Sequence, residues 1–274
     1  AYMEEEGEEG EERNWELTPS VRYITDAFDG YAFFYDRSMH VLGYRAAEMA
    51  IAAMTAVLES DVHIDAPAPH PLAKLWDLGC GTGIVGSDLA AAHAAGTWPV
   101  HWGPGERTCI EVSGRMLAEA RRKGSYDKYV QGEALEVLLR SRDAAVDLIT
   151  AADVAPYIGS LKALLQAVAG VLKRGGRFAF TIEALEPHLP LPDVLTHLQR
   201  ASAVGAEADD DEFRGRGWEL MPSGRLAHDR WHVERAALAA GFEIDAVGDG
   251  PIRWQAAQAV EGHVFVLRLP LSTE

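Results

Sequence analysis

Four glycines within twelve residues are the first feature of this 274-residue sequence that could support chemistry: Gly79, Gly81, Gly83 and Gly86 in LWDLGCGTGIVG. Glycine has no Cβ, so the backbone can turn sharply there and approach a ligand at a helix N-terminus. Gly81, Gly83 and Gly86 fit the GxGxxG pattern of dinucleotide-binding folds, which alone is a weak signal. A second interpretation starts the motif at Asp77 and Gly79, and the residues downstream decide between the two.

Acidic and aromatic residues follow the next three strand-like runs. Glu111 lies at the end of TCIEV, Glu133 follows KYVQG, and Asp153 and Tyr157 follow VDLITAA. Because the carboxyl ends of parallel strands meet at one edge of a sheet, we expect these side chains to gather beside the glycine loop. A turn, LKRGGRF, then leads into a fifth strand-like run. This order of elements resembles the class I S-adenosylmethionine-dependent methyltransferases, and DLGCGTG resembles motif I of that family.

The resemblance implies that S-adenosylmethionine is the cofactor and how the chain holds it. In such enzymes the acid after the second strand binds both ribose hydroxyls, which assigns Glu111 to a bidentate charge-assisted contact. The acid near the adenine amine would be Glu133, and Asp77 would fix the donor's ammonium directly or through water. The predicted cofactor-binding residues are Tyr31, Asp77, Gly79, Cys80, Gly81, Gly83, Glu111, Val112, Met116, Glu133, Ala134 and Asp153.

Several of these residues also fit a purely structural role. Glu133 precedes a helical pattern and fits a helix N-cap. Met116 lies on an amphipathic stretch, where it packs either on the adenine or in the core. Tyr31, Phe34 and Tyr35 either cover the donor, with a ring face toward its sulfonium, or dock a helix on the sheet. The sequence leaves these alternatives open.

The predicted catalytic residues are Asp153, Tyr157 and His228. In the family, the fourth strand ends beside the methyl donor, which places Asp153 and Tyr157 there. A neutral imidazole takes up a proton near pH 7, so His228 is the candidate base, although histidine is also common at a helix start. Arg225 and Arg253 fit either binding of a carboxylate or phosphate on the acceptor or surface salt bridges.

The acceptor is expected to be a small molecule with a carboxylate, hydroxyl or amine group, or a protein side chain. ADVAPY (152–157) differs from the Asn/Asp-Pro-Pro-Tyr pattern of enzymes that methylate nucleobase or glutamine nitrogens, which argues against those acceptors. An alternative function is a methyltransferase-like structural or assembly subunit with little or no catalysis. The acidic N-terminal segment, or residues 96–107 with Trp98 and Trp102, would then contact a partner protein.

Cysteine and histidine add no further predicted chemistry. Cys80 and Cys109 are too few for a disulfide framework, so we predict two packed thiols. The ten histidines show no metal-ligand spacing with the cysteines, so no metal site is predicted.

Strand-like and helical runs alternate after residue 72. This alternation indicates an α/β fold, and the resemblance implies a Rossmann-like, seven-stranded, mostly parallel sheet with a reversed last strand over 73–274. Before it we predict an acidic disordered tail (1–18), a helical lid (19–60) and a proline-rich linker (61–72); a cap insertion (184–226) follows strand five. Expected strands are 73–79, 108–112, 128–132, 146–152, 177–183, 242–247 and 262–269, and expected helices include 85–95, 114–123, 160–173 and 229–240.

A narrower resemblance extends from about Ser20 to Pro270. FDGYAFFYDRSMHVLGYR, ADVAPYIGSL and GRLAHDRWHVERAALAAGFEI are similar to the predicted bacterial methyltransferases that carry tetratricopeptide repeats upstream of the catalytic domain. Such repeats are absent from this sequence. Residues 96–107 and 203–217 lengthen two connections relative to that group.

The net charge of −17 is unevenly distributed. Residues 1–16 hold −7 and residues 207–212 hold −5, which leaves −5 for all the rest. No general basic surface is expected, so nucleic acid is not an expected partner. No apolar run of about 18 residues predicts a membrane span. The start does not resemble a signal or transit peptide, so we expect a cytoplasmic protein, or one in an organelle matrix after removal of an upstream targeting segment.

Overall fold

The computed structural model describes residues 19–60, 73–100, 102, 104–141, 146–185 and 217–271. The predicted tail (1–18), the predicted linker (61–72) and residues 186–216 of the predicted cap, with the acidic segment 207–212, lie outside these residues. The helices are α2 (Val21–Tyr31), η2 (Ala32–Phe34), α3 (Tyr35–Val41), α4 (Ala46–Ser60), α5 (Ile84–Ala95), α6 (Gly114–Lys123), α7 (Ala134–Arg140), η4 (Ala155–Tyr157), α8 (Lys162–Val171) and α11 (Arg230–Ala239). The strands are β1 (Ala73–Leu78), β2 (Pro104–Glu111), β3 (Lys128–Gln131), β4 (Val146–Ala151), β5 (Leu172–Ala184), β6 (Trp218–Leu220), β7 (Leu226–His228), β8 (Glu243–Gln255) and β9 (Gln258–Arg268).

Seven of these strands form the predicted sheet. β3, β2, β1, β4 and β5 lie side by side in that order and run parallel, and β9 pairs with β5 in the antiparallel direction. β8 completes the sheet against β9. The mostly parallel arrangement with a reversed last strand is therefore confirmed. The carboxyl ends of β1, β2, β3 and β4 share one edge, where α/β folds bind ligands.

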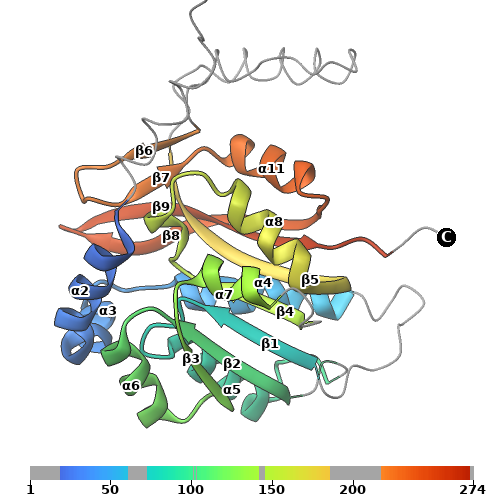
Figure 1. The fold of residues 1–274 in the computed structure, drawn as a ribbon, viewed down its shortest axis with the longest axis horizontal. Helices are drawn as coiled ribbons and strands as arrows, with labels where there is room; N and C mark the ends of the chain where they lie inside the picture. Colours follow the sequence, from blue (N-terminus) through green and yellow to red (C-terminus); the bar gives the residue numbers. More distant parts are fainter. Residues whose placement is uncertain are drawn as a thin grey trace, which may run out of the picture.

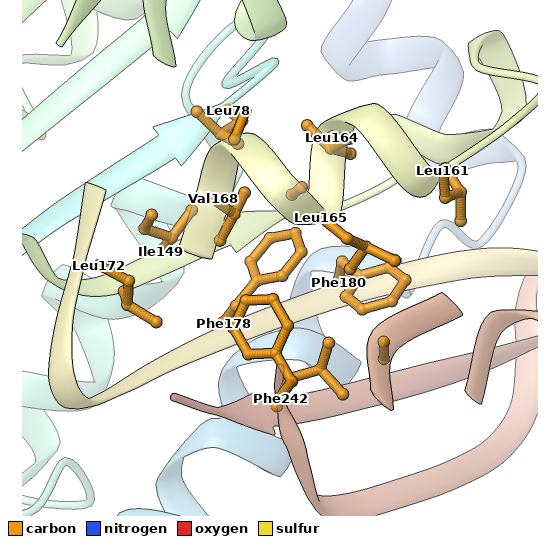
Figure 2. Packing of buried hydrophobic residues seen from close by; sticks show 14 of the residues in the cluster. Leu78, Ile149, Leu161, Leu164, Leu165, Val168, Leu172, Phe178, Phe180 and Phe242 are labelled. Carbon is orange, nitrogen blue, oxygen red and sulfur yellow. The ribbon is translucent and has the colours of Figure 1, made fainter. Parts of the chain in front are cut away.

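Side chains along β5 alternate between two apolar layers. Phe178, Phe180 and Ile182 pack in the layer of α7, α8 and α11, and Figure 2 shows Phe178 and Phe180 beneath α8. Ala179 packs with α4 and α5 on the other face. The ring centroids of Phe180 lie 4.8 Å from Phe178 and 5.1 Å from Phe265. Each buried phenyl side chain contributes about 1.5–3 kcal/mol. These layers hold the strands of the sheet in place, so the strand ends that carry the loops have fixed positions.

The predicted helical lid divides into two parts. α4 belongs to the core, because Ala46, Ala50, Met54 and Leu58 are buried and the helix packs on β5, β8 and β9. α2 and η2 instead contact α6 beside the carboxyl edge of the sheet (Figure 1). Only the segment 21–41 therefore lies where a lid would.

A membrane-spanning segment is not formed by any single helix of the described ranges. The helices of Val21–Val41 and of Ala46–Ser60 reach the required length and apolar composition only as a pair, and they are bent by 69° at the break between them.

The last two strands are longer than predicted. β8 and β9 form a hairpin that pairs from Glu243↔Arg268 to Gln255↔Gln258, whereas the predicted strands leave 248–261 unpaired. Gly248, Gly250 and Pro251 suggest a loop, but a register shift between Pro251 and Arg253 accommodates the proline within the strand. The short hairpin of β6 and β7 was also missed, and β7 pairs with the end of β5 at Glu183↔Ala227.

The aromatic residues of the 96–107 connection lie inside the protein. Trp98 and Trp102 are each 5% exposed, and the Trp98 Nε1–H donates to the backbone oxygen of Trp102 at 2.7 Å. Both pack in the α4/α5 layer. The expectation that these two side chains offer a docking surface is therefore wrong, because their apolar area is already used in folding; residues 101 and 103 lie outside the described ranges.

Candidate active site

A cavity of about 380 Å³ opens at the carboxyl edge of the sheet, between the lid segment and α8. Eight of the predicted site residues line it: Gly79, Gly81, Glu111, Val112, Glu133, Ala134, Asp153 and Tyr157. The lid contributes Val21, Ile24, Phe28 and Tyr35, and α8 contributes Ala163 and Leu164. The cavity therefore has a polar floor at the strand ends and apolar walls.

The glycine loop follows β1 and requires its glycines for two reasons. Gly79, Gly81 and Gly83 have φ of +62°, +54° and +86°, a conformation that residues with a Cβ rarely adopt. A Cβ at Gly79 would lie 2.5 Å from Cγ2 of Val154. The loop thus runs close to the end of β4, and its backbone forms part of the cavity surface.

Glu111 at the end of β2 is fixed by two backbone amides. Its Oε2 accepts from the Gly81 N–H at 2.9 Å and its Oε1 accepts from the Ser113 N–H at 2.8 Å. Burial raises the pKa of Glu111, while these amides act in the opposite direction. Each oxygen keeps a lone pair beyond the bond it accepts, so the carboxylate can accept two further hydrogen bonds from the cavity side.

Glu133 is the N-cap of α7 and also lines the cavity. Its carboxylate caps α7, because Oε1 accepts from the Leu135 N–H at 2.9 Å and Oε2 from the Glu136 N–H at 2.7 Å. The same residue lines the cavity. The cap holds the side chain in one orientation, as a binding residue requires.

Asp77 lies beneath the glycine loop and is absent from the cavity lining of the described residues. Its Oδ2 accepts from the Tyr126 hydroxyl at 2.5 Å and its Oδ1 accepts from the Thr150 hydroxyl at 2.7 Å. Burial raises the pKa of Asp77 to about 7. The Tyr126 oxygen in turn accepts from the Gly86 N–H at 2.8 Å. The structure thus makes Asp77 a support of the loop and gives it no direct contact with the cavity.

Three further predicted residues also lie off the lining. Gly83 is the N-cap of α5, where a Cβ would lie 3.2 Å from the Tyr126 ring. Met116 is fully buried in α6, which is the core alternative considered above. The Tyr31 ring stacks edge-on against Tyr35, with centroids 5.6 Å apart, so Tyr31 supports a lining residue.

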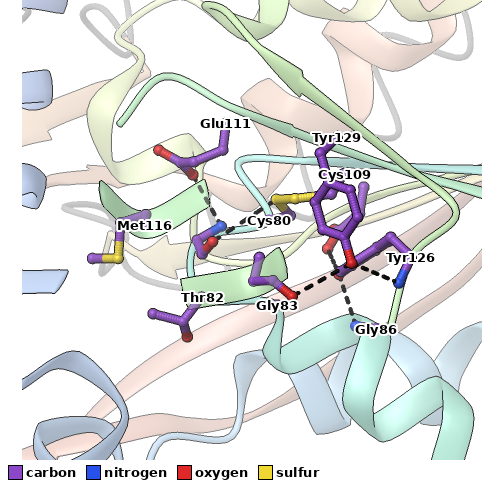
Figure 3. The surroundings of a disulfide bond; sticks show 12 residues. Cys80, Thr82, Gly83, Gly86, Cys109, Glu111, Met116, Tyr126 and Tyr129 are labelled. Atoms are coloured by element: carbon purple, nitrogen blue, oxygen red, sulfur yellow. Dashed lines mark hydrogen bonds between the residues drawn. A yellow bond between two sulfur atoms is a disulfide. The ribbon is translucent and has the colours of Figure 1, made fainter. Parts of the chain in front are cut away.

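The prediction of two free packed thiols is wrong. Cys80 and Cys109 are joined by a disulfide between the glycine loop and β2 (Figure 3). Sequence reasoning counted the cysteines but could not see that the end of β1 and the interior of β2 are neighbours. Cys80 is 6% exposed and does not line the cavity itself.

Two carboxylates attach the lid segment to the glycine loop and to the loop that follows β2. Asp29 accepts from the Ser113 hydroxyl at 2.5 Å and from the Arg115 N–H at 3.1 Å, just after Glu111. Asp36 accepts from the Thr82 hydroxyl at 2.5 Å, within the glycine loop, and pairs with Lys123 Nζ at 2.7 Å. The hydrogen bond from Ser113, followed by that from Arg115, lowers the pKa of Asp29. The lid is therefore closed over the cavity.

Arg225 organises the other end of the cavity. Its Nε donates to Glu183 Oε2 at 3.1 Å, its Nη1 donates to the Tyr157 hydroxyl at 2.6 Å, and its Nη2 donates to Asp153. Arg253 Nη2 also donates to Glu183 Oε2, at 2.7 Å. Burial alone would lower the pKa of Arg225, but Asp153, Tyr157 and Glu183 raise it above its ordinary value. The two arginines are thus buried ion-pair partners of two carboxylates.

Asp153 and Tyr157 are the members of this network that line the cavity. Asp153 has φ of +62°, a costly conformation for a residue with a Cβ, and its N–H donates to Thr181 Oγ1 at 2.9 Å. Burial raises the pKa of Tyr157, so the phenol is neutral. Since its oxygen accepts from Arg225, its own proton is available to a ligand oxygen.

His228 lies behind this network and is absent from the lining of the cavity. Its Nε2 faces the carbonyl oxygens of Ile158 and Gly159 at 2.9 and 3.0 Å, so Nε2 must carry the proton. Its Nδ1 is buried without a hydrogen-bond partner among the described residues, and burial lowers the pKa of His228. The side chain anchors the loop after Tyr157, and we no longer assign it as the base.

Glu183 is a site residue that the sequence analysis missed. It lies within the expected strand 177–183, and only the meeting of β5, β7 and β8 reveals its two arginine partners. A charged residue inside an otherwise apolar strand was the available signal.

The family model for a methyltransferase domain matches residues 76–180, which include the glycine loop, Glu111, Glu133, Asp153 and Tyr157. Residues 76–180 are therefore assigned to a methyltransferase domain. A malonyl-(acyl-carrier protein) O-methyltransferase of Enterobacter lignolyticus is 31% identical over 116 residues, which cover 42% of this chain and 40% of that protein. The match thus spans less than half the length of this curated relative.

Solved structures share the fold of the methyltransferase domain. A magnesium protoporphyrin IX methyltransferase from Synechocystis with bound SAH has a TM-score of 0.56 and 15% identity, covering 90% of this chain and 98% of that one. The cyclase SpnF has a TM-score of 0.58 and 16% identity, covering 93% and 98%. At these identities the likeness concerns the fold alone, and the second structure shows that the fold also serves another reaction.

The cavity of the methyltransferase domain fits S-adenosylmethionine. The glycine loop leaves backbone exposed where a Cβ at Gly79 would clash, and Glu111 keeps two acceptor positions for ribose hydroxyls. Glu133, held by its cap, and Val112 also line the cavity, where the sequence analysis expects the adenine. The aromatic rings of Phe28 and Tyr157, with centroids 5.3 Å apart, meet over the opposite end.

Proposed function

We propose that this protein transfers a methyl group from S-adenosylmethionine to a carboxylate of a small molecule, a narrower form of the carboxylate, hydroxyl or amine acceptor expected from the sequence. The observation that carries the proposal is the Arg225 network, which presents the Tyr157 hydroxyl and Asp153 to the cavity. The bound donor supplies an electrophilic methyl group on a sulfonium. The chain's own residues then need to orient an oxygen nucleophile and exclude water.

A carboxylate acceptor fits the residues available for proton transfer. Among the described residues, no histidine, lysine or cysteine lines the cavity. Glu111 and Glu133 already accept backbone amides, and Asp153 is paired with Arg225. A hydroxyl or amine sheds a proton on methylation, whereas a carboxylate attacks as the anion and leaves as a neutral ester with no proton to remove. A base is therefore unnecessary.

Two side chains would hold the carboxylate. The Tyr157 proton can be donated to one oxygen, and the Arg225 guanidinium lies directly behind that hydroxyl, so it stabilises added negative charge at this end. The relative named above acts, by its name, on malonyl-(acyl-carrier protein), and this supports an O-methyl product. The resemblance to the repeat-associated bacterial group stays a prediction and does not restrict the acceptor.

The donor part of the proposal is tested by calorimetric titration with S-adenosylmethionine and its demethylated product. Glu111→Gln keeps the shape of the side chain but removes the charge, and it should weaken binding by roughly 1.5–3 kcal/mol, the range for hydrogen bonds to a charged group. No binding of either ligand below about 1 mM, which is about −4 kcal/mol, would contradict the cofactor assignment.

The acceptor part is tested with labelled donor and mixtures of small carboxylic acids, alcohols and amines. Methyl esters release the label as methanol in mild alkali, whereas methyl ethers and methylamines keep it. We expect alkali-labile label on the carboxylic acids, and less of this label with the Arg225→Lys variant. Alkali-stable label would assign a hydroxyl or amine acceptor instead. Donor binding without transfer to any extract component would favour the alternative of an assembly subunit.

A further inference from the structure

The disulfide of Cys80 and Cys109 lies directly beside the donor site. Cys80 stands between Gly79 and Gly81, which line the cavity, and Cys109 is two residues before Glu111 on β2 (Figure 3). We propose that this pair is a redox modification site that controls donor binding: the disulfide holds the glycine loop in the binding geometry, and its reduction releases the loop. The inference rests on the proposed function, since it concerns binding of the same donor.

Three links join the loop to β2 within a few residues. The Cys80 N–H donates to the Ile110 oxygen at 3.2 Å, and the Gly81 N–H donates to Glu111 Oε2 at 2.9 Å. The disulfide is the third link, with Cα atoms 5.5 Å apart. Because Glu111 is the predicted ribose ligand and also binds the loop amide, a movement of the loop changes the donor site itself.

The packing around the two sulfur atoms means that a change in the distance between them moves the glycine loop. Cys109 is fully buried in β2, which β1 and β3 hold on both sides. Leu117, Ala120 and Tyr126 pack against the pair. Bonded sulfurs lie about 2.0 Å apart, whereas non-bonded heavy atoms prefer about 3.5–4 Å. Two thiols must therefore separate by about 1.5–2 Å, and in a packed core the loop is the part that can shift.

Reduction has a balanced course with a dithiol such as dithiothreitol. A thiolate of the reagent attacks one sulfur of the pair, which forms a mixed disulfide and releases the other cysteine as thiolate. The second thiol of the reagent then closes its own ring and releases the first cysteine. Two electrons and two protons pass to Cys80 and Cys109, and the reagent leaves as a cyclic disulfide.

Binding and redox state are coupled in both directions. If the oxidised protein binds a ligand tenfold more tightly than the reduced protein, the ligand favours the oxidised state tenfold by linkage. For a two-electron couple, this factor lowers the reduction potential by about 30 mV. The demethylated donor product should therefore make the disulfide harder to reduce, which a merely structural disulfide remote from the site would not show.

The experiment compares the 274-residue protein in the two states, each verified by intact mass and by thiol titration after unfolding. Calorimetric titration with the demethylated donor product should give affinity at least about tenfold weaker for the reduced protein, the loss expected when a hydrogen bond to a charged group breaks. Cys109→Ser should match the reduced protein and be insensitive to reductant. Cys109→Ala is a second variant in case serine disturbs β2, and circular dichroism reports on folding.

The possible outcomes separate this inference from the proposed function. Equal affinity in both verified states, or in Cys109→Ser and the oxidised protein, would overturn the redox control and leave the methyltransferase proposal intact. Two free thiols that persist after treatment with oxidised dithiothreitol would also overturn it. Absence of binding in both states would overturn the donor assignment and this inference together. Tighter binding in the oxidised state, with a product-dependent shift in redox equilibrium, supports the inference.

Discussion

The carboxyl of Asp77 offers a direct test of how the glycine loop is supported. Burial raises its pKa from the ordinary value of 3.8 to about 7, although the hydroxyls of Tyr126 and Thr150 act in the opposite direction. Between these two pH values the folded protein binds a proton that the unfolded chain lacks. The free energy of unfolding therefore falls as pH rises, by up to about 1.4 kcal/mol per pH unit. The full effect reaches about 4 kcal/mol.

Asp77→Asn removes the titration and keeps the size of the side chain. Its Oδ1 can still accept from one hydroxyl, and the other hydroxyl can turn to accept from the new amide. Denaturant unfolding of both proteins, from about pH 4 to about pH 8, gives the difference in stability at each pH. The wild type should lose stability relative to Asp77→Asn up to about pH 7 and no further above it. Parallel curves over this window would refute the assignment of a buried, proton-binding Asp77.

Three other predictions concern the loop, the acceptor end and the lid. Gly79→Ala, where a Cβ meets Val154 at 2.5 Å, should cost about 1–3 kcal/mol more stability than Gly96→Ala, where φ is +70° but no atom lies within 4 Å; equal losses in denaturant unfolding would count against the close approach. Arg225→Lys should lower kcat/KM for the acceptor by about 10–100-fold at unchanged donor affinity, since lysine cannot bridge Glu183, Tyr157 and Asp153. Asp36→Asn should weaken calorimetric binding of the demethylated donor by about 0.5–1.5 kcal/mol through loss of the Thr82 and Lys123 contacts. Asp26→Asn is the control, because Asp26 pairs with Arg22 on its own helix, and it should leave the affinity unchanged. Identical affinities for both variants would show that the contacts of Asp36 have no effect on donor binding.

The sequence was sufficient for the parts of the site that depend on strand ends. Gly79, Gly81, Glu111, Glu133 and Asp153 were placed at one edge because parallel strands end together, and the structure brings these residues to one cavity. The order of strands and loops along the chain determines which residues reach this edge, and side-chain packing has little influence on it. The end of α11 was predictable from local sequence: the helix expected over 229–240 is followed by Gly241, whose φ of +86° is a conformation common just after a helix.

The sequence did not predict whether a side chain at a strand end faces the cavity or packs beneath the loop. Asp77 and Glu111 both stand at strand ends, yet Asp77 turns beneath the loop toward Tyr126, whereas Glu111 lines the cavity. The difference depends on Tyr126, which Gly86 admits, because a Cβ there would lie 2.4 Å from the tyrosine ring. The hydrogen bond between Asp77 and Tyr126 joins residues 49 positions apart, so no local sequence pattern predicts it.

The charges around the cavity explain why donor and acceptor should bind together. Glu111, Glu133 and Asp153 line it, and among the described residues no lysine or arginine does. This surface suits a cationic sulfonium and would repel a carboxylate that entered alone, since two unit charges 4 Å apart interact by roughly 4 kcal/mol even at an effective dielectric of 20. Arg225 offsets Asp153, and the donor's positive charge offsets the acceptor's negative charge. In the proposed reaction, transfer of the methyl group would neutralise the sulfonium and the carboxylate at once, so the ester would lose its attraction to Arg225 just when it must leave.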